Sequence, residues 1–180
     1  EYRVYFTNTY WGGLYYRGIH LDLCPSRTGW RDGNYTAPNG FKSGISVNAW
    51  HDVTLFVHQG IMTSDLYIDG KQIFVNEPIQ TAFTNNTVGF ASNYYSGSIL
   101  IDNFKVRDQS LMSTPTPLVA VYDFNEGTLG GWIGNGAVSN VNWTVTSSAL
   151  RSTVIGTGGY TYLWPYALDI STKDLTLEYD

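Results

Sequence analysis

The chain has 180 residues and a mass of 20.1 kDa, which is enough for one sizeable hydrophobic core. Hydrophobic residues make up 43%, aromatic residues 16% and charged residues 14%, and this composition is typical of a Tyr- and Gly-rich β protein. A net charge of -5 provides no basic surface that could neutralise phosphates, which argues against nucleic acid as a partner. No apolar run approaches the roughly 20 residues of a membrane helix, and no signal peptide is recognisable. We therefore expect a soluble chain that is already processed if it is secreted.

The first half of the chain alternates apolar and polar residues, which is the period of a β-strand. In residues 49–60 this alternation predicts a strand buried mainly on one face. Residues 64–75 predict two strands, Leu66–Asp69 and Gln72–Val75, joined by a tight turn at Gly70–Lys71 for which Asp69-Gly70 supplies the turn chemistry. Residues 86–92 and 97–107 predict further strands.

The alternation stops after Arg107, where residues 108–117 form a polar segment with Pro115 and Pro117. A proline cannot donate to a strand ladder, so this segment predicts a linker. The chain therefore divides into residues 1–107, a Pro/Ser/Thr linker at 108–117, and residues 118–180. The last of these begins with a predicted strand at Val119–Phe124, a glycine-rich turn and a Trp-containing strand.

The two segments resemble the two parts of one known β-sandwich, in inverted order. YDFNEGTLGGW at 122–132, NWTVTSSALRST at 142–153 and LTLEYD at 175–180 are similar to the opening of a concanavalin-A-like or laminin-G-like domain. EYRVYF at 1–6, WGGLYYRG at 11–18, residues 48–74, VGFAS at 88–92 and ILIDNFKV at 99–106 resemble its close. This superfamily includes sugar-binding modules and domains related to family 16 glycoside hydrolases. The resemblance implies an all-β fold, an antiparallel two-sheet jelly-roll sandwich that is split or circularly permuted.

The ends of the chain suggest how the two parts meet. Superposing Glu178-Tyr179 on Glu1-Tyr2 closes the sequence into a circle with a repeat of 178 - 1 = 177 residues. Neither segment can bury its apolar strand faces alone. Three arrangements complete the sandwich: a circular permutation within one chain, a window of a longer tandem array, or exchange of residues 118–180 with the next subunit. We favour a polymer or array, since a neighbour that continues the strand would order both ends.

Hydrolase activity is not expected. The enzymes of the resembled family carry an E-x-D-x-x-E motif whose carboxylates act as nucleophile and acid. Glu178 and Asp180 match its first two positions, but the superposed start has Arg3 in place of the aspartate, and no third acid follows. His51 and His58 lie seven residues apart on one predicted strand, so they point to opposite faces and cannot share a metal. Isolated acids are expected to be solvated surface charges; these are Asp22, Asp52, Asp65, Asp69 and Glu77.

A calcium site is a candidate on the segments that correspond to the first and last strands of the resembled sandwich. Ca²⁺ prefers hard oxygen ligands, which YDFNEG and LIDNF supply. The candidate ligands are Asp102, Asn103, Asp123, Asn125 and Glu126. The resemblance implies a structural calcium here, although the same side chains also suit turns. No other cofactor is expected.

Aromatic residues form a candidate sugar-binding surface, because flat rings can stack on pyranose faces while polar neighbours bind hydroxyls. The candidates are Tyr10, Trp11, Tyr15, Tyr16, Trp30 and Tyr35. Tyr and Trp in alternating strands also serve as core or interface residues, and the sequence leaves both roles open.

Three N-x-T sequons begin at Asn34, Asn85 and Asn142 and are candidate glycosylation sites. With the low Lys content, they favour an extracellular or cell-surface protein, for which glycans are additional partners. The single Cys24 cannot form an internal disulfide. The sequence thus predicts an extracellular structural subunit or repeat that assembles head to tail with copies of itself. A carbohydrate-binding module and a degenerate glycoside-hydrolase-like domain are the alternatives.

Overall fold

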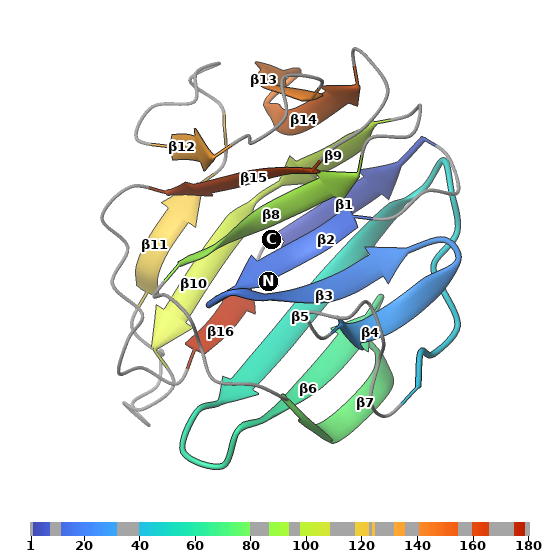
Figure 1. The fold of residues 1–180 in the computed structure, drawn as a ribbon, viewed down its shortest axis with the longest axis vertical. Coiled ribbons are helices and arrows are strands. Elements are labelled where there is room, and N and C mark those ends of the chain that lie inside the picture. Colours follow the sequence, from blue (N-terminus) through green and yellow to red (C-terminus); the bar gives the residue numbers. More distant parts are fainter. Residues whose placement is uncertain are drawn as a thin grey trace.

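A computed structural model shows two antiparallel β-sheets packed face to face in a sandwich-like arrangement (Figure 1). The structure describes residues 2–7, 12–31, 40–79, 87–93, 98–108, 118–122, 124, 132–135, 141–154, 160–165 and 175–178. Every regular element in these ranges is a strand, which confirms the all-β prediction. The described residues accordingly hold no helix with the length and apolarity needed to cross a membrane.

Sixteen strands are described. Their bounds are β1 Tyr2–Phe6, β2 Gly12–Tyr16, β3 Ile19–Cys24, β4 Arg27–Arg31, β5 Trp50–His58, β6 Thr63–Ile68, β7 Lys71–Pro78, β8 Val88–Asn93, β9 Ile99–Asp102, β10 Phe104–Asp108, β11 Leu118–Tyr122, β12 Trp132–Asn135, β13 Val141–Thr146, β14 Ala149–Val154, β15 Tyr160–Pro165 and β16 Leu175–Glu178.

The larger sheet runs in the order β11-β10-β16-β5-β1-β9-β14-β13, and β6 and β7 extend it from the other edge of β5. The smaller sheet runs in the order β12-β15-β8-β2-β3-β4. In Figure 1, β3 of the smaller sheet crosses β5 of the larger one. Strands of residues 118–178 pair with strands of residues 2–108 in both sheets, so the two segments share both sheets. Within the first segment, β7-β6-β5-β1-β9 and β8-β2-β3-β4 also pair directly with one another.

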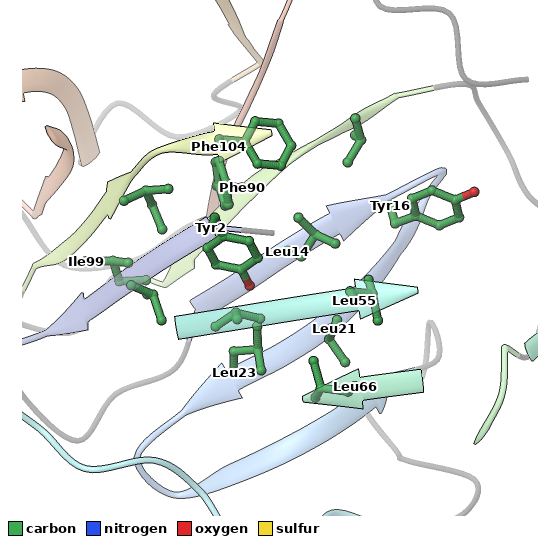
Figure 2. Packing of buried hydrophobic residues seen from close by; sticks show 14 of the residues in the cluster. Tyr2, Leu14, Tyr16, Leu21, Leu23, Leu55, Leu66, Phe90, Ile99 and Phe104 are labelled. Atoms are coloured by element: carbon green, nitrogen blue, oxygen red, sulfur yellow. The ribbon is translucent and has the colours of Figure 1, made fainter. Parts of the chain in front are cut away.

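The hydrophobic core lies between the sheets and receives side chains from both (Figure 2). On β5, Val53, Leu55 and Val57 are fully buried while the residues between them are not, which confirms the predicted one-sided strand. Polar and aromatic contacts also join the sheets: Tyr2 packs edge-on against Phe90 at 5.1 Å between ring centroids. A Cβ at Gly12 of the smaller sheet would collide with the carbonyl oxygen of Ala91 on the neighbouring strand and with Ile99 of the larger sheet, so this position favours glycine.

The hairpin between β6 and β7 differs by one residue from the predicted turn. Ile68 pairs with Lys71, so the two turn residues are Asp69 and Gly70 rather than Gly70 and Lys71. Both have positive φ, +53° and +71°, as the two-residue hairpin turn that fits the twist of the strands requires. Asp69 therefore belongs to the turn and not to the end of β6.

Candidate functional site

Strands β16 and β1 lie end to end in one row of the larger sheet, which we call the composite lane (residues 175–178 and 2–6). One side of the lane pairs with β5. The other side pairs with β10 and β9. Although β16 comes from the second segment of the chain, both of its neighbours come from the first.

The register along β5 runs through the junction of the two strands without a break. Leu177 of β16 faces Leu55, and Tyr2 of β1 faces Val53. A single position of β5, Thr54, therefore separates them, and Glu178 is the next residue of the lane after Leu177. Opposite Leu55, Thr54 and Val53 of β5, the successive residues of the composite lane are therefore 177, 178 and 2.

On its other side, the composite lane meets a bulge at Asn103. Glu178 faces Lys105, and Arg3 faces Asp102. Between these two pairs the composite lane advances by two residues, from Glu178 to Arg3, whereas the paired strands β10 and β9 span three residues, from Lys105 to Asp102. One residue on the β9–β10 side is therefore unpaired. Asn103 lies between β9 and β10 and has φ +50°, the left-handed conformation that bulge residues adopt and that asparagine tolerates. The β9–β10 chain is thus one bulged strand along the lane.

Arg3 is the central charge of the composite lane. Its Nε lies 3.8 Å from Asp52 Oδ1 on β5, and its Nη1 lies 3.9 Å from Asp102 Oδ2 on β9. Its guanidinium also stacks over Trp50 at 4.9 Å from the ring centroid. Burial raises the pKa of Asp52, Asp69 adds to this rise, and Arg3 opposes it. Arg3 is therefore a cation that links β1 to both of its neighbouring strands.

Tyr2 anchors the lane in the core. It is fully buried, and its ring contacts Phe90 and Phe104 edge-on at 5.1 and 6.3 Å between centroids. Burial raises the pKa of its hydroxyl well above the usual value. Within the described part of the chain, this hydroxyl has no hydrogen-bond partner.

Two of the calcium candidates lie at the bulge. Asp102 Oδ1 accepts a hydrogen bond of 2.8 Å from the Asn103 amide, and its other oxygen faces Arg3. Asp123, Asn125 and Glu126 lie outside the described residues. The described ranges contain no group of three or more His, Cys, Asp or Glu residues that could hold a metal.

The sugar-binding candidates separate into three groups. Tyr16 and Trp30 lie in the core, at 0% and 5% exposure, where a sugar ring cannot stack on them. Tyr16 accepts a hydrogen bond from Gln59 Nε2 at 2.8 Å, and Trp30 Nε1 donates to Ser64 Oγ at 2.7 Å. Tyr15 is half-buried and packs edge-on against His20 at 5.4 Å. Tyr10, Trp11 and Tyr35 lie outside the described residues.

Of the glycosylation candidates, the structure describes the backbone of Asn142 alone. Asn142 belongs to β13, which is the last strand in the order of the larger sheet, and pairs with Thr153 of β14. Asn34 and Asn85 lie outside the described residues. Cys24 is buried, and burial raises the pKa of its thiol.

The prediction that Asp22 is a solvated surface charge is wrong. Asp22 is 1% exposed and lies between Arg27, whose Nη2 is 2.8 Å from Oδ2, and Arg31, whose Nε is 3.5 Å from Oδ1. Burial raises the pKa of Asp22, and Arg31 and Arg27 oppose this rise. His20 Nδ1 lies 3.0 Å from Arg31 Nη2 and accepts its hydrogen bond, because a guanidinium can only donate. Burial and Arg31 lower the pKa of His20 to about 3.

This buried charge cluster was missed because each charged residue was considered alone. The alternating hairpin of β3 and β4 contains the signal: it pairs His20 with Arg31 and Cys24 with Arg27, on either side of Asp22. Asp22 itself faces Gly29, so Arg27 and Arg31 are its diagonal neighbours on the same face of the hairpin. Diagonal neighbours are within reach of long side chains, so opposite charges at these positions indicate an ion pair.

No family model matches the chain, and no curated protein or solved structure matches it either.

Proposed function

We propose that the chain is the structural unit of a linear polymer of β-sandwiches, in which residues 118–178 of one unit and residues 2–107 of the next form one sandwich. The unit is a subunit that assembles head to tail or a repeat of a tandem array, and both have the same composite lane. In this proposal the sandwich is a concanavalin-A-like jelly roll whose two parts occur in inverted order.

The position of β16 is the observation that carries the proposal. It is a central strand, hydrogen-bonded to β10 on one side and to β5 on the other, and both of these strands belong to the other segment. A central strand supplied by a separate segment can be donated by a neighbour with the same hydrogen bonds and the same register. Without it, β5 and β10 would expose unpaired edges where β16 now lies.

The sequence pattern of the lane supports a continuous strand. Leu175 and Leu177 alternate with polar residues, and Tyr2, Val4 and Phe6 continue the same alternation when Glu178 precedes Tyr2. The order 177, 178, 2 is the one expected if Glu178 and Glu1 are equivalent positions of a 177-residue repeat. The strand register therefore agrees with the sequence repeat from which the array is proposed.

An extracellular or cell-surface location is part of the proposal and is supported by the three sequons. The role is structural and does not include glycoside hydrolysis, since Arg3 takes the place of a motif acid. The burial of Tyr16 and Trp30 gives no support to sugar binding through these two rings.

A pair of cysteines across β10 and β16 tests whether the lane forms between chains. Arg107 and Thr176 face each other in register, so Arg107→Cys with Thr176→Cys places two thiols at disulfide distance. We expect oxidation of the purified double variant to give a ladder of covalent multimers of the 20.1 kDa chain on a non-reducing gel. Negative-stain images of the same sample should show filaments.

Two controls make the result unambiguous. Each single-cysteine variant should give at most a dimer, and Cys24 should not interfere because it is buried. A disulfide formed entirely within monomers, identified by intact mass, would show that the chain closes on itself, and the polymer proposal would then be abandoned.

A further inference from the structure

Three side chains outside the composite lane are aligned as a hydrogen-bonded relay. Ser46 Oγ lies 2.9 Å from His51 Nε2, and His51 Nδ1 lies 2.7 Å from Asp69 Oδ2. They come from the segment before β5, from β5 itself and from the β6–β7 turn. A hydroxyl, an imidazole and a carboxylate in this order form the arrangement that activates a serine, which is recognised by geometry and not by sequence spacing.

Backbone contacts fix each member of the relay. The segment around Ser46 is held by the backbone amides one residue before and two residues after it, since Ile45 N donates to Cys24 O at 3.1 Å and Asn48 N donates to Phe6 O at 2.8 Å. The Asp69 carboxylate is oriented by its second oxygen, which accepts a hydrogen bond of 2.9 Å from the Asp52 amide. His51 is 8% exposed on the core-facing side of β5, so its ring is held by packing.

The carboxylate of Asp69 determines where the imidazole carries its proton. A carboxylate accepts from Nδ1–H, which leaves the lone pair of the neutral ring on Nε2, facing the Ser46 hydroxyl. Once Nε2 takes up a proton, it can donate to the Ser46 carbonyl oxygen, which lies 3.1 Å away. The site therefore provides an acceptor for the hydroxyl proton and a partner for the imidazolium that results.

We propose that Ser46 is an activated nucleophile for small acyl esters, with His51 as general base and Asp69 as its positioning residue. Ser46 is exposed and Asp69 is half-exposed, so a small reagent reaches the hydroxyl directly. This inference goes beyond the structural role and does not depend on it, because all three residues belong to the first segment.

The reaction balances without a cofactor. Ser46 Oγ attacks the ester carbonyl and forms the Oγ–acyl bond, while its proton passes to His51 Nε2. The C–O bond to the alcohol breaks, and the alcohol leaves with that proton. Water then attacks the acyl-serine by the same route in reverse, giving a carboxylic acid and free Ser46.

A fluorophosphonate probe tests the nucleophile, because Ser46 Oγ would form the bond to phosphorus as fluoride leaves. Peptide mass spectrometry of the labelled, folded chain should find the adduct on Ser46. The matched control is Ser43, which is also exposed and lies three residues earlier. Labelling of Ser46 and Ser43 to the same extent, or of neither, would overturn the proposal.

The Asp69→Asn variant tests whether Ser46 reacts because the relay activates its hydroxyl or only because its side chain is exposed. The substituted amide keeps its oxygen on the Asp52 amide and turns its NH₂ toward Nδ1, so Nε2 becomes the protonated nitrogen and can no longer accept from Ser46. We expect the labelling rate and the release of 4-nitrophenolate from 4-nitrophenyl acetate to fall about 10²-fold or more, with the unfolding temperature little changed. Equal rates in a folded Asp69→Asn variant would contradict the role of the relay.

Discussion

At the scale of single residues, two buried tyrosines show how the same side chain can stabilise or weaken the core. Tyr2 and Tyr16 are both fully buried and belong to opposite sheets. The Tyr16 hydroxyl accepts a hydrogen bond from Gln59, whereas the Tyr2 hydroxyl has no hydrogen-bond partner among the described residues. A buried hydroxyl without a partner loses its hydrogen bonds to water on folding and forms none in the protein. Its removal should therefore raise the free energy of unfolding.

We therefore expect Tyr2→Phe to raise the free energy of unfolding by about 1 kcal/mol, because the ring contacts remain and the unsatisfied hydroxyl is removed. Tyr16→Phe is the matched control and should lower it by about 1 kcal/mol, because a buried hydrogen bond is lost. Urea denaturation of both variants measures the difference. If Tyr2→Phe is destabilised as much as Tyr16→Phe, the Tyr2 hydroxyl is hydrogen-bonded in the folded protein and the prediction is wrong.

At the scale of strands, the bulge at Asn103 allows the buried residues of β9 and those of β10 to face the same side, although the first lie at odd positions and the second at even positions. Ile99 and Ile101 are buried at odd positions, whereas Phe104 and Val106 are buried at even positions. One inserted residue shifts the parity by one, so both pairs of side chains can point into the core. This depends on a residue that adopts a positive φ at position 103.

A β-branched residue at position 103 should disrupt this bulge. We expect Asn103→Val to lower the free energy of unfolding by about 1–3 kcal/mol, because the branched side chain clashes with the backbone at φ +50°. Asn103→Gly should stay within about 1 kcal/mol of the parent, since glycine adopts this conformation without strain. Chemical denaturation gives both values, and equal losses in the two variants would indicate that side-chain contacts, not the backbone conformation, matter at this position.

How far the sequence predicts these elements depends on the range of the interactions involved. The one-sided burial of β5 was predicted because alternation is a local signal. The break of parity between Ile101 and Phe104 was equally visible and would have predicted the bulge. By contrast, the core position of Tyr16 and Trp30 depends on which face of a distant sheet covers them, and a single strand cannot show this.

The relay of Ser46, His51 and Asp69 also includes a long-range contact, because Asp69 lies 18 residues after His51. Its members come together because β1, β5 and the β6–β7 turn are neighbours in space. The alternation of residues 49–60 predicts that His51 and His58 lie on opposite faces of the strand, and the burial pattern of β5 agrees. The same alternation contains no signal for a serine partner of His51.

At the scale of the whole molecule, the contacts in the composite lane do not depend on the order of the two segments in the chain. The order decides only which residues are joined by a peptide bond. The same strand neighbours form whether Glu178 and Tyr2 are bonded or only adjacent in the lane. Joining them directly would turn two short strands into one long strand. In the proposed assembly, this connection would also remove the need for a partner, because both segments would then fold as one continuous sandwich.

We expect a rearranged chain, residues 118–178 followed directly by residues 2–107, to fold as a stable monomer, because the bond from Glu178 to Tyr2 keeps Leu177 opposite Leu55 and Tyr2 opposite Val53. Light scattering should give the mass of a single chain, and circular dichroism should give a β spectrum with a cooperative unfolding transition. The matched control inserts one alanine between Glu178 and Tyr2. This insertion shifts β16 by one position along β5 and exchanges the strand faces on which its alternating apolar and polar residues lie, so it should lower the stability markedly. If the two rearranged chains were equally stable, the register of the lane would not be what holds β16 in place, and the equivalence of residues 178 and 1 would fail with it.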